Sequence, residues 1–179
     1  MTGIAIFEIK LYLMKFTLSL TAILFFNISF AQVNVSTKAY GQLEFNELDH
    51  GLAEVVPGKI EKLKASPNGT HGWLQDFAIV KVTDSIAIQP KANFGVVYIV
   101  KAKDTVDIDV AIEWIYPEKI VNEKGEKFKS IKYSTKRPTN IPSASSYSLD
   151  EPYEMVKGNW EMNIYIEKKK VYSKTFFLY

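Results

Sequence analysis

The fold is decided by the stretch Val106-Asp107-Ile108-Asp109-Val110-Ala111-Ile112-Glu113-Trp114. Apolar and mainly polar residues alternate along it, which is the period of a β-strand with one buried face. The pattern predicts that Val106, Ile108, Val110, Ile112 and Trp114 share the side that faces the core.

Other segments carry the same kind of signal. Residues 94–100 are continuously apolar and rich in β-branched side chains, which predicts a central strand covered on both faces. Residues 160–166 alternate, and residues 171–178 follow closely, so these two segments should form a hairpin that turns near Lys168–Lys170. Trp114 and Trp160, at inward positions, are expected to anchor the core.

The remaining strands are weaker. Lys38–Leu48 is apolar on one narrow side and is expected to be an edge strand, and Gly72–Val82 follows the turn dipeptide Asn68-Gly69. Phe128–Thr135 gives a more polar strand, and no segment of helical length has the helical period. We therefore predict one all-β domain, an immunoglobulin-like antiparallel β-sandwich of seven or eight strands, with a small barrel as the alternative.

Residues 14–32 have the build of a secretory signal. Lys15 follows Met14, an apolar core spans residues 16–30, and Ser29 and Ala31 stand where a signal peptidase reads small residues. We expect residues 1–31 to be the signal peptide, with translation starting at Met14, and residues 32–179 to be the mature domain. The alternative is a retained anchor over residues 4–30, although charged residues interrupt that segment.

The composition limits the partners. The chain has no cysteine, so neither disulfides nor a lipidated cysteine is expected, and its net charge is only +2. Without a concentrated basic face, nucleic acid is not an expected partner. We expect an exported monomer in the periplasm or outside the cell, with no stable membrane span after signal cleavage, that meets a protein or polysaccharide of the envelope.

The second half of the chain resembles a known family, domain of unknown function 3859, which consists of bacterial and mostly exported small domains. The similarity rests on the following residues: Thr83, Ile86, Pro90, Phe94-Gly95-Val96-Val97-Tyr98, Tyr116-Pro117, Gly158-Asn159-Trp160, Ile164-Tyr165 and Phe176-Phe177. Tyr116 stands where the family tends to have histidine. The family has no established activity, so the resemblance implies a fold and leaves the function open.

No catalytic, cofactor or metal site emerges from the sequence. The two histidines, His50 and His71, are far apart, and neither has the spacing of a metal site or a catalytic triad. Asp104, Asp107 and Asp109 are typical of a solvated strand rather than a calcium loop. The carboxylates that could serve a hydrolase would be Glu113 paired with Glu151, Glu154 or Glu161, but nothing singles out a pair.

Five residues are weak candidates for binding. Trp73 follows a glycine-rich turn, so it either contacts a ligand or packs at the end of the sandwich. Lys132 and Arg137 belong to a basic stretch that protects an edge strand or meets an anionic envelope component. Tyr147 and Tyr153 lie in a segment over 138–153, expected to be a loop, whose serine and tyrosine content suits contacts.

The favoured interpretation is thus a non-enzymatic binding or interaction module. Two alternatives remain open. One is a small carboxylate-based hydrolase or carbohydrate-active protein, and the other is an assembly factor that exchanges a strand along the Lys38–Leu48 edge.

Overall fold

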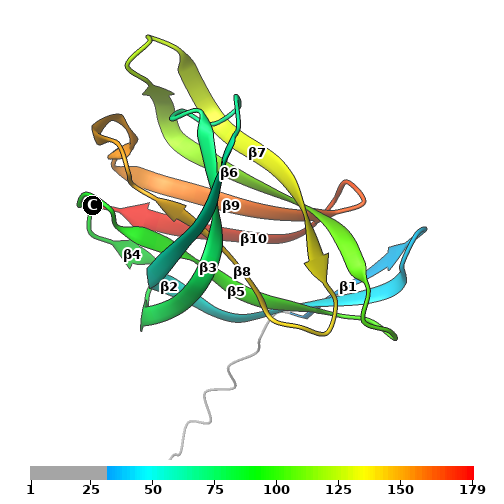
Figure 1. Ribbon diagram of the computed structural model, residues 1–179. Coiled ribbons are helices and arrows are strands. Elements are labelled where there is room, and N and C mark those ends of the chain that lie inside the picture. Colours follow the sequence, from blue (N-terminus) through cyan, green and yellow to red (C-terminus); the bar gives the residue numbers. More distant parts are fainter. Residues whose placement is uncertain (1–31) are drawn as a thin grey trace, which may run out of the picture.

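The computed structural model describes residues 32–179, which form two five-stranded sheets packed face to face (Figure 1). The first sheet contains β1 (Gln32–Thr37), β2 (Gly41–Lys62), β3 (Thr70–Val82), β5 (Asn93–Lys101) and β8 (Ser143–Ser148). The second contains β4 (Ser85–Ile86), β6 (Asp107–Val121), β7 (Lys127–Pro138), β9 (Gly158–Ile166) and β10 (Lys169–Leu178). A single 3-10 turn covers Pro152–Glu154.

Two open sheets, each with its own edges, confirm the sandwich and set aside the barrel. All pairings are antiparallel except that of β4 with β10. The ten strands exceed the predicted seven or eight because β1, the two-residue β4 and the serine-rich β8 carry little apolar alternation of their own. The predicted signal peptide and the start at Met14 lie outside the described residues. Among residues 32–179, no helix is long and apolar enough to cross a membrane.

The core lies where the alternating segments predicted it. The inward residues of the two predicted segments are at most 1% exposed: Ile108, Val110, Ile112 and Trp114 of β6, and Trp160, Met162, Ile164 and Ile166 of β9. Val106 is the exception, because it precedes the first residue of β6 and is 44% exposed. The prediction for β5 holds on one face only, since Val97 and Ile99 on the other face are half-buried.

The prediction that Lys38–Leu48 forms a sheet edge is wrong. β1 pairs with the first part of β2 in the register Val35↔Leu43, and β5 pairs with its other side from Glu44 onward. Residues 44–46 are thus paired on both sides, and β1, not this segment, is the outer strand of the sheet.

The hairpin of β9 and β10 turns at Glu167-Lys168, where both residues have positive φ, as a two-residue hairpin turn requires. The carboxylate of Glu167 also accepts hydrogen bonds from the backbone N–H groups of Lys38 and Ala39, at 2.8 and 2.7 Å. This contact joins the turn of the second sheet to the turn between β1 and β2 of the first.

β2 is long enough to leave its own sheet. Up to Ala53 it pairs with β5, but beyond that residue it pairs only with β3. We call residues 54–78, the outer halves of β2 and β3 with their connecting turn, the arm. The arm crosses to the second sheet (Figure 1), where the Nδ2 of Asn122 donates to the carbonyl of Pro67 at 3.1 Å.

Candidate functional site

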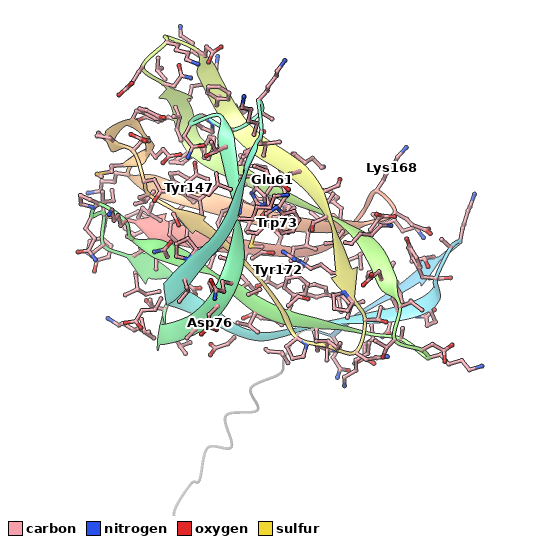
Figure 2. All side chains as sticks on the ribbon, viewed as in Figure 1. Glu61, Trp73, Asp76, Tyr147, Lys168 and Tyr172 are labelled. Atoms are coloured by element: carbon pink, nitrogen blue, oxygen red, sulfur yellow. The ribbon has the colours of Figure 1, made fainter. Side chains whose placement is uncertain are left out.

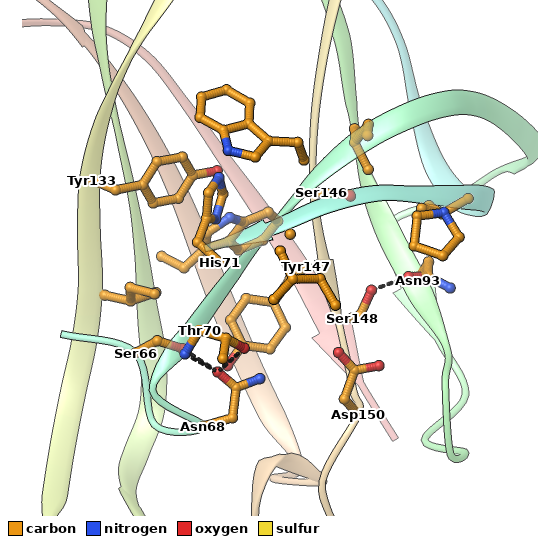
Figure 3. Close-up of a pocket in the computed structure, with 18 of the residues that line it drawn as sticks. Ser66, Asn68, Thr70, His71, Asn93, Tyr133, Ser146, Tyr147, Ser148 and Asp150 are labelled. Carbon is orange, nitrogen blue, oxygen red and sulfur yellow. Dashed lines mark hydrogen bonds between the residues drawn. The ribbon is translucent and has the colours of Figure 1, made fainter. Parts of the chain in front are cut away.

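A cavity of about 390 Å³ lies between the arm, β7 and β8 (Figure 3). Its volume falls within the usual range for small-molecule sites, roughly 300–1,000 Å³. Residues from the arm, β5, β6, β7 and the segment around β8 line it: Val55, Pro57, Ile60, Ser66, Asn68, Thr70, His71, Gly72, Trp73, Leu74, Lys91, Asn93, Trp114, Ile131, Tyr133, Ser146, Tyr147, Ser148 and Asp150.

Aromatic side chains from separate strands form one side of the cavity. The ring of His71 on the arm lies 4.2 Å from that of Tyr133 on β7 and 5.4 Å, edge-on, from that of Trp73. The rings of Trp114 and Tyr147 are 5.7 Å apart and also edge-on. These contacts fix the orientation of the rings before any ligand arrives.

Polar groups face the cavity from β8 and from the tip of the arm. The hydroxyl of Ser148 donates to Asn93, and the side-chain oxygen of Asn68 accepts bonds from Ser66 and Thr70 (Figure 3). Asp150 contributes a carboxylate. A small set of placed polar groups among aromatic rings is the usual make-up of a site that orients a ligand.

Trp114 supplies a polar group without a partner. Its side chain reaches the cavity and is 1% exposed, yet among the described residues its indole N–H has no acceptor. An unsatisfied buried donor is unfavourable by about 1–3 kcal/mol. A ligand oxygen or a water molecule in the cavity would satisfy it.

Arg137 closes the other end of the site. A second, much smaller hollow of about 20 Å³ adjoins the cavity and shares His71, Trp73 and Tyr133 with it. Arg137 lines this hollow, and the carbon of its guanidinium lies 5.9 Å from the centre of the Trp73 ring. The hollow beside the cavity is therefore cationic, and Lys91 is a second cation, in the lining of the cavity itself.

The charge states of the arm follow from its contacts. Burial lowers the pKa of His71, and the charge of Arg137 lowers it further, so the imidazole is neutral at pH 7. Lys59, whose Nζ lies 2.7 Å from Oε1 of Glu61, lowers the pKa of that carboxyl group; Glu61 and Trp73 both belong to the arm (Figure 2).

Tyr147 is also part of a buried hydrogen-bond chain. Its hydroxyl donates to Oε1 of Glu154 at 2.9 Å and lies 3.3 Å from the hydroxyl of Tyr116. The other Glu154 oxygen accepts bonds from the backbone N–H groups of Asp150 and Glu151. Burial raises the pKa values of both Tyr147 and Glu154. The chain fixes the Tyr147 ring and the neighbouring Asp150 backbone.

Three of the five predicted binding residues meet at this site. Trp73 and Tyr147 line the cavity and Arg137 lines the adjoining hollow, although they come from three different strands. Lys132 lies elsewhere, 3.6 Å above the ring of Tyr165. Tyr153 sits in the 3-10 turn and packs against the core, where burial raises its pKa to about 12.

The segment over 138–153 is not the loop that we predicted. Its centre is β8, which pairs with β5, and Tyr147 is 8% exposed because its ring packs between Trp114 and Trp160. Sequence reasoning also missed His71, Tyr133 and Asp150 as lining residues. Only the structure of the arm brings His71 to Tyr133, so no local signal could have found that pair.

The proposed hydrolase carboxylates do not meet here. Glu113 binds the Tyr165 hydroxyl at 2.5 Å and Lys132 at 3.8 Å on the strands of the second sheet, and Glu154 is in the buried chain described above. Asp150 is the one carboxylate among the described residues that line the cavity. Within residues 32–179, no cluster of three potential metal ligands occurs.

The fold is similar to that of known structures. The crystal structure of an immunoglobulin-like protein from Pseudomonas aeruginosa has a TM-score of 0.54 at 16% identity, covering 84% of this chain and 99% of that one. This similarity confirms the immunoglobulin-like fold. An alkylpurine DNA glycosylase from Pseudomonas fluorescens (TM-score 0.35, 11% identity, 53% and 27% covered) and a beta-glucosidase from Listeria innocua (0.33, 5%, 72% and 16%) are more distant.

No curated protein sequence matches the chain. A family model does match, over residues 47–178, and its description is "Domain of unknown function (DUF3859)". The match includes all the motifs on which the resemblance was based, from Thr83 to Phe177, and covers most of the described residues. The chain therefore belongs to the DUF3859 family.

Proposed function

We propose that this protein is an exported, non-enzymatic binding module that holds a small polar ligand, or the end of an envelope polymer, in the cavity under the arm. The observation that carries the proposal is the composition of that cavity. Aromatic rings fixed by their mutual contacts face placed hydroxyl, amide and carboxylate groups, and the Trp114 indole N–H lacks a partner among the described residues.

The arrangement favours binding over catalysis. A hydrolase of the carboxylate type needs two carboxyl groups across the scissile bond, whereas Asp150 alone represents that chemistry in the described lining. The neutral His71 contacts aromatic rings, with no nucleophile bonded to it among the described residues. Binding requires only the groups that are present.

Ligand-observed NMR on the purified protein tests the binding proposal. The panel contains monosaccharides, disaccharides, short peptides and small carboxylic acids. We expect at least one class to give saturation-transfer signals that Trp73→Ala abolishes. Phe177→Ala is the control, because it removes a 43% exposed aromatic ring of β10 that is not among the cavity residues. Signals that survive Trp73→Ala, or that both variants lose equally, would contradict the proposal, as would a panel without any signal.

Export is tested separately. The full chain, with a tag after Tyr179, is expressed in a Gram-negative host, and the fractions are analysed by intact-mass spectrometry. We expect a periplasmic or secreted product that begins at Gln32, because the sequence predicts cleavage after Ala31. An uncleaved product in the cytoplasm or the membrane would overturn this part of the proposal.

A further inference from the structure

Arg137 has no charged partner. Among residues 32–179, no carboxylate lies within ion-pair distance of its guanidinium. Its Nε is buried without an acceptor, and Nη2 makes only a long contact, 3.4 Å, with the carbonyl of Ala144. A half-buried arginine that retains free donors is suited to bind a planar anion such as a carboxylate.

The surroundings of Arg137 differ from those of Lys132 and Lys136 on the same strand. Lys136 is 2.7 Å from Asp109 and Lys132 is 3.8 Å from Glu113, so carboxylates already accompany both ammonium groups. Arg137 instead lies among the rings of His71, Trp73 and Tyr133. It is the cation of this strand that the fold directs to the cavity.

The other end of the cavity has different chemistry. Asp150, Asn93 and Ser148 line the large cavity but not the hollow at Arg137, whereas Arg137 lines the hollow but not the large cavity. Carboxylate and amide oxygens accept hydrogen bonds from hydroxyl groups. The large cavity is lined by both Lys91 and Asp150, so its charges are mixed, whereas Arg137 is the one charged residue of the described chain that lines the hollow. The anion therefore belongs at the Arg137 end, with hydroxyl groups at the Asp150 end.

If the cavity is the binding site, as proposed above, we infer that its ligand is an acidic saccharide, a pyranose ring that carries a carboxylate. The carboxylate binds Arg137, the ring packs along Trp73 and Tyr133, and the hydroxyl groups reach Asp150, Asn93 and Ser148. A purely apolar acid would bring no hydroxyl groups to Asp150, and a neutral sugar would leave Arg137 without a charged partner.

Isothermal titration calorimetry on the full protein tests the inference. The ligands are glucuronic and galacturonic acid and their di- and trisaccharides, with glucose, galactose, their neutral oligomers and acetate as comparisons. We expect the acidic sugars to bind at least about tenfold more tightly than the neutral ones, because charge-assisted hydrogen bonds between the sugar carboxylate and the Arg137 guanidinium stabilise the complex. Arg137→Gln should remove this preference, and Arg137→Lys should restore part of it because it keeps the charge without the planar fork.

Lys132→Gln is the matched control. It removes a positive charge from the same strand but outside the cavity, so the preference should remain. Equal urea midpoints for the variants establish that they are folded. The inference is overturned if neutral and acidic sugars bind equally, if the preference survives Arg137→Gln, or if acetate binds as tightly as the uronic acids. If no sugar binds but another compound class gives the Trp73-dependent NMR signal, the inference fails and the proposed binding function stands.

Discussion

Replacing Gly95 with alanine is expected to destabilise the fold by about 3 kcal/mol, at the upper end of the usual range for overpacking. A Cβ atom on Gly95 would lie 2.3 Å from the carbonyl oxygen of Ser145 and 2.7 Å from the Cα of Ser146. Ordinary contacts of a carbon atom begin near roughly 3.5 Å. Both neighbours are backbone atoms of β8, which cannot rotate away. β8 must therefore move by roughly 1 Å or lose hydrogen bonds to β5.

Urea unfolding followed by tryptophan fluorescence measures the loss. For a domain of this size, 3 kcal/mol corresponds to a decrease in Tm of roughly 6–12 °C. Gly72→Ala is the control, because a Cβ there meets no atom within 4 Å and the strand position tolerates alanine. Its free energy of unfolding should stay within about 1 kcal/mol of the wild type. Equal stability of the two variants would refute the claim that β8 packs too closely on β5 for any side chain.

Three further changes test the buried chain, the core and the surface. The raised pKa of Glu154 means that the folded protein binds this proton more tightly than the unfolded chain. The resulting stabilisation is present below the ordinary pKa of 4.5 and is lost as the pH rises through the raised pKa. Glu154→Gln should therefore flatten the curve of unfolding free energy against pH in this range. Trp160→Ala should reduce the unfolding free energy by about 3–5 kcal/mol, because the ring is fully buried. Lys136→Ala should change it by less than about 0.5 kcal/mol, since its pair with Asp109 is exposed; a larger loss in urea unfolding would contradict this.

The strands that could be predicted are those whose two faces differ. β6 and β9 alternate because one face packs on the opposite sheet and the other carries mainly polar residues, so the period of two was visible in residues 108–114 and 160–166. The hairpin turn was located within a residue or two, because the apolar patterns end on either side of it.

β8 shows what the sequence alone could not supply. Serine, which fills most of Ser143–Ser148, has little preference for strands, and the segment is a strand because β5 offers hydrogen bonds and Gly95 allows close approach. The length of β2 was hidden for a similar reason. β2 continues through Gly51 and Pro57, although both residues are unfavourable within strands: Gly51 pairs with both β5 and β3, and Pro57 lies between two register shifts in the arm.

The arm also explains why the site could be predicted only in part. Trp73 and Arg137 stood out as single residues, but their proximity depends on a two-stranded extension that crosses between sheets. No residue of the arm belongs to the buried apolar core of the described chain, and Val56 and Ile60 on it are 48% and 66% exposed. The sandwich is therefore complete without the arm. What the arm adds is one wall of the cavity, with His71 and Trp73 on it, so this extension shapes the proposed binding site rather than the core.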